Sequence, residues 1–363
     1  MTVWGLDLGN KQTKLYSDKC GSKKGAIVLP STIAYKKMVD GRFAFGDPAD
    51  VDTYQSSRAD NKFYWGRGVF NFQREALADT LGFTGRYDQD NFKNIAEFSL
   101  GRLAKDYPEF SDKVQPVTVA VGLPSGDFNE VNIKKMIKQF MGQHLTNVND
   151  QAYTVKVEHV YVIPQSIGTL YALMVDDKGK VIDADLAQKR VAVIDDGGGT
   201  LLADQFINFR FDEMHRAQLE TGVNLLYKQI SKAIDQEFTI NSDLHVIEQA
   251  LRDGEHSHKF QYKQSDNNIF DITDLVERSI DFYTKTLCES VYNTFDNLAD
   301  IDVLIFTGGG ASIINHNIVE NFFAQTEVRF VPNPEVANVK GFYRYGIVQE
   351  QRVKVDDNHE QKD

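Results

Sequence analysis

The chain has 363 residues, of which 42% are hydrophobic and 25% are charged, a composition typical of a globular protein with one large domain or two smaller ones. Its formal net charge of -12 argues against direct binding to nucleic acid, which depends on clustered Lys and Arg side chains. The chain has two cysteines, Cys20 and Cys288, which exclude a disulfide framework and fit a reducing cytoplasm. The N-terminus does not have the pattern of a signal segment. No run of 18 apolar residues is present, which excludes a membrane-spanning helix.

Two strand–turn–strand patterns mark the two halves of the chain. Residues 1–9 and 190–199 are apolar runs that end in Asp and Gly, and each is followed by a second apolar run, at 13–17 and at 201–208. A strand that meets an Asp/Gly turn and returns as a second strand is typical of a β-hairpin. We therefore predict a duplicated design with two lobes.

The remaining elements of the first half are mixed. Residues 117–121 predict a buried strand, and apolar side chains at helical spacing predict a helix over 133–141. Valines between 155 and 162 indicate a strand, after which Pro164 stands where a helix over 165–174 would begin. Residues 35–110 are irregular, polar and aromatic, and we interpret them as a smaller inserted subdomain.

In the second half, apolar spacing predicts a helix that begins at Gly222, a long helix over 276–295, and a helix over 314–323. Residues 303–306 predict a buried strand that leads into three glycines. We place a first lobe at 1–182 and a second lobe at 183–348, with a small subdomain at about 220–298. The chain ends in a polar tail at 349–363, of which residues 352–363 are expected to be frayed.

Three Gly- and Asp-rich segments that follow apolar strands are candidate phosphate-binding loops: GLDLGNKQTK at 5–14, DDGGGT at 195–200 and TGGGAS at 307–312. Small residues let the backbone approach a polyphosphate and donate N–H groups to its oxygens. An Asp beside a phosphate is favourable when it holds Mg2+ through water. Each segment taken singly also suits an ordinary tight turn. The sequence contains neither a Walker lysine loop nor a dinucleotide GxGxxG loop.

The order and spacing of these segments resemble the actin, heat-shock-chaperone and sugar-kinase superfamily over nearly the whole chain. The matching segments, in chain order, are phosphate loop one at 7–14, a connecting segment at 164–172, phosphate loop two at 195–200, an adenosine loop at 307–312 and a second connecting segment at 338–346. Within the superfamily, four segments look like the ParM/StbA-type plasmid-segregation actins: VAVGLPS at 119–125, PQSIGTL at 164–170, FTGGGA at 306–311 and ANVKGF at 337–342. The resemblance implies an α/β actin-like ATPase fold, with duplicated RNase H-like lobes around a nucleotide cleft.

The resemblance also implies roles for individual residues. Asp7 and Asp195 would hold Mg2+ through water, and Gln165 would orient the attacking water, which is most of what phosphoryl transfer requires. Lys14 would reach the β- and γ-phosphates, and Gly222 the ribose. The complete set of implied nucleotide contacts is Gly9, Asn10, Lys11, Lys14, Gly197, Gly198, Gly199, Thr200, Gly222, Asn224, Gly308, Gly309 and Gly310.

Two positions depart from the family pattern. Asp196 stands where an apolar residue is usual, and the sequence gives no role for its charge. Lys11 replaces a common second glycine. No side chain is assigned to the adenine ring, so the choice of ATP over GTP rests on the resemblance.

The function that the resemblance implies is ATP- or GTP-driven polymerisation with Mg2+ as cofactor. The chain would form filaments with itself and reach plasmid DNA through a ParR-like DNA-binding adaptor, which suits its acidic charge. Alternatives on the same fold are a small-molecule kinase of the sugar or acetate type, and a chromosomal or phage cytoskeletal protein. A chaperone-type ATPase would need a further substrate-binding domain.

Other candidates favour ordinary structural interpretations. His256 and His258 could be half of a metal site, but they lie in a polar segment without companion ligands, so we expect solvated histidines. Cys20 and Cys288 have no nearby Cys/His motif and are expected to fill space in the core. The lysines at 134, 135 and 138 are expected to form a solvated helix face.

Overall fold

The chain folds into two compact units. The computed structural model describes residues 1–20, 25–40, 48–80, 85–111, 113–295 and 298–360. One unit combines Met1–Ala184 with Val336–Asp363, and the other is Asp185–Glu335. Residues 336–348, which the sequence analysis assigned to the second lobe, thus belong to the first unit, because the helix that contains them packs against the first strand of the chain.

A ten-stranded sheet forms the first unit, in the order β3-β2-β1-β8-β10-β9-β5-β6-β4-β7. At its centre β1 (Thr2–Leu8), β8 (Gln115–Leu123) and β10 (Gln151–Pro164) run parallel. The other strands are β2 (Gln12–Tyr16), β3 (Ile27–Pro30), β4 (Thr32–Tyr35), β5 (Asp52–Ser56), β6 (Phe63–Trp65), β7 (Leu77–Asp79) and β9 (Gly142–Val148). The predicted first hairpin is confirmed, since β1 and β2 pair antiparallel.

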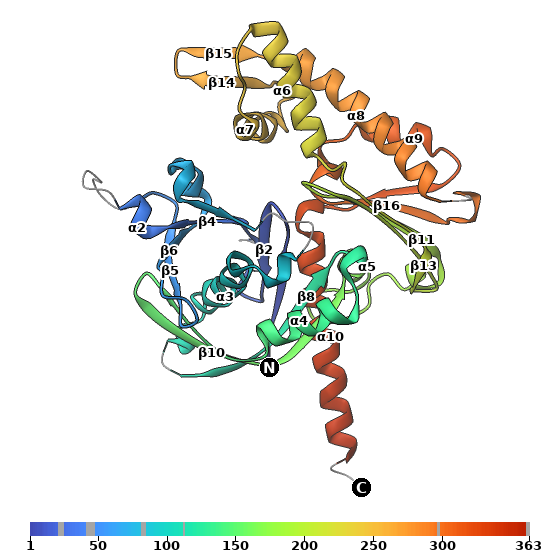
Figure 1. Ribbon diagram of the computed structural model, residues 1–363. Coiled ribbons are helices and arrows are strands. Elements are labelled where there is room, and N and C mark those ends of the chain that lie inside the picture. The colour runs from blue at the N-terminus through green and yellow to red at the C-terminus, as the bar shows by residue number, and fades with distance from the viewer. Residues whose placement is uncertain (21–24, 41–47, 81–84, 112, 296–297, 361–363) are drawn as a thin grey trace. The chain divides into compact units, whose positions relative to one another are not determined.

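Helices cover both faces of this sheet, as the apolar central strands require (Figure 1). They are α2 (Lys36–Val39), α3 (Asp90–Ala104), α4 (Glu130–Phe140), α5 (Gln165–Met174) and α10 (Ala337–Glu360). Side chains alternate along β1: Trp4 and Leu6 join the core that α3 covers, whereas Val3 packs with Val339 of α10.

The segment at 35–110 does not form a sheet of its own. Its strands β5, β6 and β7, together with β4, which ends where the segment begins, continue the ten-stranded sheet beyond β9. Tyr54, Phe63 and Trp65 pack against Phe98 of α3, within the same hydrophobic core as Trp4. Residues 41–47 and 81–84 of the predicted subdomain lie outside the described residues.

The prediction of a frayed end over residues 352–363 is wrong for most of its length, because α10 continues to Glu360 (Figure 1). The buried carboxylate of Glu350 fixes the helix to the sheet: its Oε1 accepts a 2.7 Å hydrogen bond from Thr118 Oγ1 and lies 2.6 Å from His159 Nδ1. The residues from Gln349 to Lys354 are mostly good helix formers, with neither Gly nor Pro to end the helix. Residues 361–363 lie outside the described part of the chain.

The second unit has a five-stranded sheet in the order β13-β12-β11-β16-β17. Its strands are β11 (Arg190–Asp196), β12 (Leu201–Ile207), β13 (Arg210–Leu219), β16 (Val303–Thr307) and β17 (Glu327–Phe330). Its helices are α6 (Asn224–Phe238), α7 (Leu244–Gly254), α8 (Thr273–Thr294) and α9 (His316–Phe322), and β14 (Gln261–Ser265) pairs with β15 (Asn268–Asp271). The predicted second hairpin and the long helix are confirmed.

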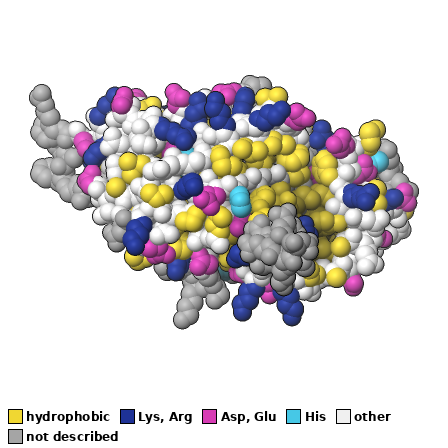
Figure 2. Space-filling view, turned by 90° about the horizontal axis from the view of Figure 1, so that it is seen from below, with side chains coloured by type: hydrophobic (Ala, Val, Ile, Leu, Met, Phe, Trp, Pro, Cys, Tyr) yellow, Lys and Arg dark blue, Asp and Glu magenta, His cyan; other side chains and the backbone are white. Residues whose placement is uncertain are grey.

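Two further observations concern the helices as candidate membrane spans and the charges on one face of the molecule. Among the described residues, no helix combines the length and the apolar character needed to cross a membrane. On the face drawn in Figure 2, Lys and Arg side chains lie interspersed with Asp and Glu side chains instead of forming one continuous basic area.

Candidate functional site

The first candidate phosphate loop is the turn between β1 and β2. Hairpin register places Asp7 opposite Lys14, and Lys14 Nζ lies 3.4 Å from Asp7 Oδ2. Asp7 is buried, and the turn residues Gly9, Asn10 and Lys11 are half-buried. A Cβ on Gly9 would lie only 2.7 Å from Gln12 O, so the tight turn requires glycine there. In the described part of the chain, Asn10 Oδ1 is buried and has no hydrogen-bond partner, so the turn retains an unused polar atom.

Two residues that the sequence analysis missed donate hydrogen bonds to the backbone carbonyl groups of this turn. Arg86 Nη2 donates hydrogen bonds of 2.6 Å to Leu8 O and to Gly9 O. Ser31 Oγ donates a 2.7 Å hydrogen bond to Gly9 O. Arg86 lies in the segment that the sequence analysis read as irregular, and no local pattern distinguishes it from other arginines.

Gln165 is the first residue of α5, directly after β10. Because β1, β8 and β10 are parallel, Gln165 and Asp7 belong to the carboxyl edge of the same sheet. Glycine packing fixes α5 against α10: a Cβ on Gly341 would lie 1.6 Å from Gly168 O, and Phe342 occupies the space over Gly122 and Gly168. Thr169 Oγ1 also donates a 2.6 Å hydrogen bond to Asn338 Oδ1. These contacts explain why both segments carry glycine.

The second candidate loop closes the β11–β12 hairpin. Gly197 N–H donates to Thr200 O at 2.9 Å, which forms the turn. The start of α6 packs onto it: Val223 N–H donates to Gly197 O at 3.0 Å and Asn224 N–H donates to Gly198 O at 2.9 Å. A Cβ on Gly222 would lie 2.3 Å from Gly197 O, so only glycine fits. Two segments that the sequence analysis placed in one site are therefore in contact.

The third candidate loop follows β16, which runs parallel to β11 with Thr307 beside Asp195. Gly308 has a φ of +84°, and a Cβ there would lie 2.4 Å from Asp195 Oδ1. A Cβ on Gly310 would lie 1.9 Å from Asp196 Oδ2, whereas one on Gly309 would have no described atom within 4 Å. Gly308 and Gly310 pack onto the second loop, and Gly309 leaves open space.

Asp196, whose role the sequence left open, lies inside the second unit. Its side chain is fully buried, and Tyr283 Oη of α8 donates to Oδ1 and Oδ2 at 2.8 and 2.9 Å. Burial raises the pKa of Asp196 to about 8; the neighbouring Asp195 adds to the shift and the Tyr283 hydrogen bond opposes it. Asp196 thus connects the second loop with α8 and fills the space beside Gly310.

The predicted site residues divide between the two units. Asp7, Gly9, Asn10, Lys11, Lys14 and Gln165 lie in the first unit. Asp195, Gly197, Gly198, Gly199, Thr200, Gly222, Asn224, Gly308, Gly309 and Gly310 lie in the second. Within each unit, the predicted residues gather at the carboxyl ends of the parallel strands.

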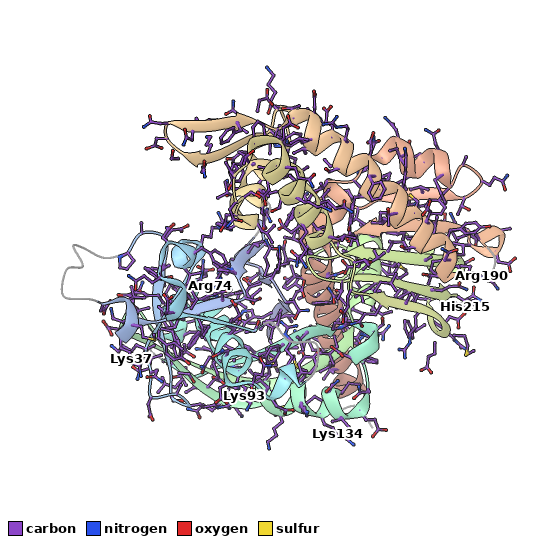
Figure 3. All side chains as sticks on the ribbon, turned by 45° about the horizontal axis from the view of Figure 1, so that its top comes forward. Lys37, Arg74, Lys93, Lys134, Arg190 and His215 are labelled. Atoms are coloured by element: carbon purple, nitrogen blue, oxygen red, sulfur yellow. The ribbon has the colours of Figure 1, made fainter. Side chains whose placement is uncertain are left out.

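The other candidates have structural explanations. His256 and His258 are exposed, and the described residues contain no group of three or more His, Cys, Asp and Glu suited to a metal ion. Cys20 and Cys288 are buried. Lys134 points away from its unit (Figure 3) and forms an exposed ion pair of 3.1 Å with Glu130 one turn earlier on α4.

Each unit presents an Asp near the end of a strand beside a hairpin turn that contains glycine. Comparison with protein families agrees: residues 5–168 match the N-terminal domain of actin-like proteins, and residues 190–329 match the Alp7A C-terminal domain. The chain belongs to the actin-like proteins.

Solved structures show the same fold over nearly the whole chain. The apo ParM protein of pSK41 is 23% identical, with a TM-score of 0.75 over 97% of this chain and 99% of that one. The archaeal actin homologue Ta0583 is 17% identical, with a TM-score of 0.75 over 95% and 99%. The actin-like protein Alp7A is 15% identical, with a TM-score of 0.76 over 99% of both chains. A search of curated protein sequences found no match.

Proposed function

We propose that this chain binds and hydrolyses ATP with Mg2+ and polymerises into dynamic filaments that segregate plasmid DNA through a DNA-binding adaptor. The observation that carries the proposal is the convergence, within one unit, of Asp195, the turn at 197–200, Gly222 and the loop at 308–310. These glycines let three backbone segments approach one another and the Asp195 carboxylate at a strand end, an arrangement that suits a metal-bound polyphosphate.

Related structures agree with nucleotide binding. ParM of Bacillus thuringiensis, 15–16% identical to this chain, has been solved with ADP, with AMPPNP and with ATP, at TM-scores of 0.71–0.72. The archaeal actin homologue Ta0583 has been solved with ADP. We extend nucleotide binding to the present chain, with GTP as the alternative to ATP.

Each chemical task of the proposed hydrolysis has a candidate residue. Asp7 and Asp195 would hold Mg2+, since carboxylate oxygens suit a hard cation, and the ion would neutralise charge on the β- and γ-phosphates. Lys14, which lies 3.4 Å from Asp7, would contact the same phosphates. The amide of Gln165 is a poor base, so it would orient the attacking water and leave proton transfer to the phosphate or solvent.

The filament follows from coupling between nucleotide and conformation. A nucleotide that binds one arrangement of the chain more tightly than another shifts the population towards it, and head-to-tail contacts that do not close into a ring produce a helical filament. The net charge of -12 favours contact with DNA through a basic adaptor over direct binding.

Sedimentation tests the proposal directly. Purified chain at tens of micromolar is centrifuged with Mg2+ and ATP, ADP, GTP or no nucleotide, while phosphate release is measured and the pellets are inspected by negative-stain microscopy. We expect filaments with a triphosphate, and loss of phosphate release in Asp195→Ala. Asp302→Ala, an exposed aspartate of the same unit whose Oδ2 accepts a 2.7 Å bond from Arg190 N–H, is the matched control. Phosphorylation of a sugar or acetate panel without filaments would contradict the proposal.

A further inference from the structure

Arg86 is a buried guanidinium directly under the first candidate phosphate loop. Its side chain is 7% exposed, and its Nη2 donates to the carbonyl oxygens of Leu8 and Gly9 at 2.6 Å. Within the described ranges, no carboxylate lies within ion-pair distance of it, so its hydrogen-bond partners are neutral. Among these same residues, Arg86 Nε is buried without a hydrogen-bond partner. Keeping a charge in such surroundings is costly unless an anion lies nearby.

The two hydrogen bonds determine which way the loop N–H groups point. In a trans peptide the C=O and the following N–H point in opposite directions, and the described chain contains no cis peptide. Because Arg86 holds Leu8 O and Gly9 O, the N–H groups of Gly9 and Asn10 point to the opposite side of the loop. Ser31 Oγ, at 2.7 Å from Gly9 O, fixes the second of these peptides again.

The positive charge of Arg86 and the orientation of the loop N–H groups both favour a bound phosphate. Arginine stays protonated even when burial lowers its pKa, as it does here. Among the described residues, Tyr87, Asp7 and Asp127 oppose this lowering of the Arg86 pKa through space. A phosphate on the far side of the turn would therefore meet both oriented N–H donors and a buried positive charge that water screens weakly.

We propose that Arg86 is a positioning residue for polyphosphate: it orients the N–H groups of the first loop and supplies the buried positive charge beneath them. The inference rests on the proposed nucleotide binding and adds a residue to it. It requires that removing the guanidinium weaken binding in proportion to the number of phosphates, with ATP affected more than ADP and ADP more than AMP.

The test measures dissociation constants of Mg-ATP, Mg-ADP and AMP by calorimetry for the wild type, Arg86→Gln and Arg86→Lys. A matched control is Arg344→Gln. Arg344 lies in the same unit and also donates to a backbone carbonyl, Ala172 O at 2.5 Å, but it is bonded to Asp177 at 2.8 Å and does not touch the loop. Circular dichroism and thermal melting are recorded for each variant.

We expect Arg86→Gln to weaken Mg-ATP binding at least about tenfold, the loss typical of removing hydrogen bonds from a charged group. Arg86→Lys, which keeps the charge without the planar fork, should fall between Arg86→Gln and the wild type. Arg344→Gln should keep wild-type affinity even where its melting temperature falls. A smaller loss for AMP than for ATP separates the charge from a general structural effect.

Two results would overturn the inference: a folded Arg86→Gln that binds Mg-ATP within about twofold of the wild type, or an Arg344→Gln that loses as much affinity as Arg86→Gln. Should Arg86→Gln not fold, the same twofold criterion applies to Arg86→Lys. A wild-type chain that binds no nucleotide would instead refute the proposed function, so the two failures are distinguishable.

Discussion

The contact between Gly341 of α10 and Gly168 of α5 gives a quantitative prediction, because α5 begins at the candidate water-orienting residue Gln165. In Gly341→Ala the new Cβ would lie 1.6 Å from Gly168 O and 2.4 Å from its carbonyl carbon. These atoms belong to the backbone of a packed helix, so no side-chain rotation relieves the clash. The two helices must separate by more than about 1 Å at this contact, and protein interiors are close-packed, so the shift disturbs neighbouring side chains.

The expected cost follows from two opposing effects. Overpacking typically destabilises by about 1–3 kcal/mol, and a backbone obstacle belongs at the upper end of that range. Alanine in place of glycine inside a helix returns up to about 1 kcal/mol. We therefore expect a net loss of about 2 kcal/mol and a melting temperature lower by about 4–8 °C, since about 1 kcal/mol corresponds to 2–4 °C for a unit of this size.

Gly346→Ala on the same helix is the control. There the new Cβ would lie 2.6 Å from Cγ1 of the buried Val3 and 3.3 Å from Ala120 Cβ. These are side-chain atoms and not backbone, so we expect a smaller loss of stability than in Gly341→Ala. Thermal unfolding followed by circular dichroism measures both variants, and phosphate release reports whether the shift of α5 reaches Gln165. A Gly341→Ala variant as stable as Gly346→Ala would refute the packing argument.

Three further predictions concern single side chains. Gln165→Ala should bind nucleotide and assemble, but release phosphate slowly and leave longer-lived filaments; wild-type hydrolysis in this variant would remove Gln165 from its proposed role. Burial raises the pKa of Asp196 to about 8, whereas an unfolded Asp titrates near ~3.9, so the native chain keeps a proton that the unfolded chain releases. The free energy of unfolding should thus fall as the pH rises from about 4 to about 8, and urea titrations without nucleotide should show a shallower fall in Asp196→Asn; equal slopes would contradict this. Burial also raises the pKa of Cys288 to about 12, so a thiol reagent at about pH 8 should label it only in denaturant, and rapid labelling of native protein would show that it is accessible.

The sequence predicted those parts of the fold whose signal is local. The two Asp/Gly hairpins, the central strand at 117–121 and the long helix from Thr273 to Thr294 each carry an apolar period or a turn signal of their own. The glycines of the loops were assigned to one site through the resemblance to the actin superfamily, since each glycine-rich turn taken alone also suits an ordinary tight turn. The site residues now have a geometry, while their roles in nucleotide chemistry stay predictions.

Other features could not be predicted because they depend on partners far away in the sequence. Arg86 reaches Leu8 O across 78 residues, and Tyr283 reaches Asp196 across 87. The polar end of α10 is helical partly because Glu350 bonds to Thr118, 232 residues earlier. A pattern within one segment cannot reveal contacts with residues far away in the sequence. An isolated arginine or a polar tail is therefore predicted to be exposed on the surface.

Calorimetric titration of the folded chain with Mg-ATP, below the concentration at which it assembles, tests nucleotide binding most directly. We predict saturable binding at one site per chain that weakens when Mg2+ is chelated and is lost in Asp195→Ala. Titrations with Mg-ATP and Mg-GTP that give no binding heat, on protein whose circular dichroism shows the mixed helices and strands described above, would contradict it.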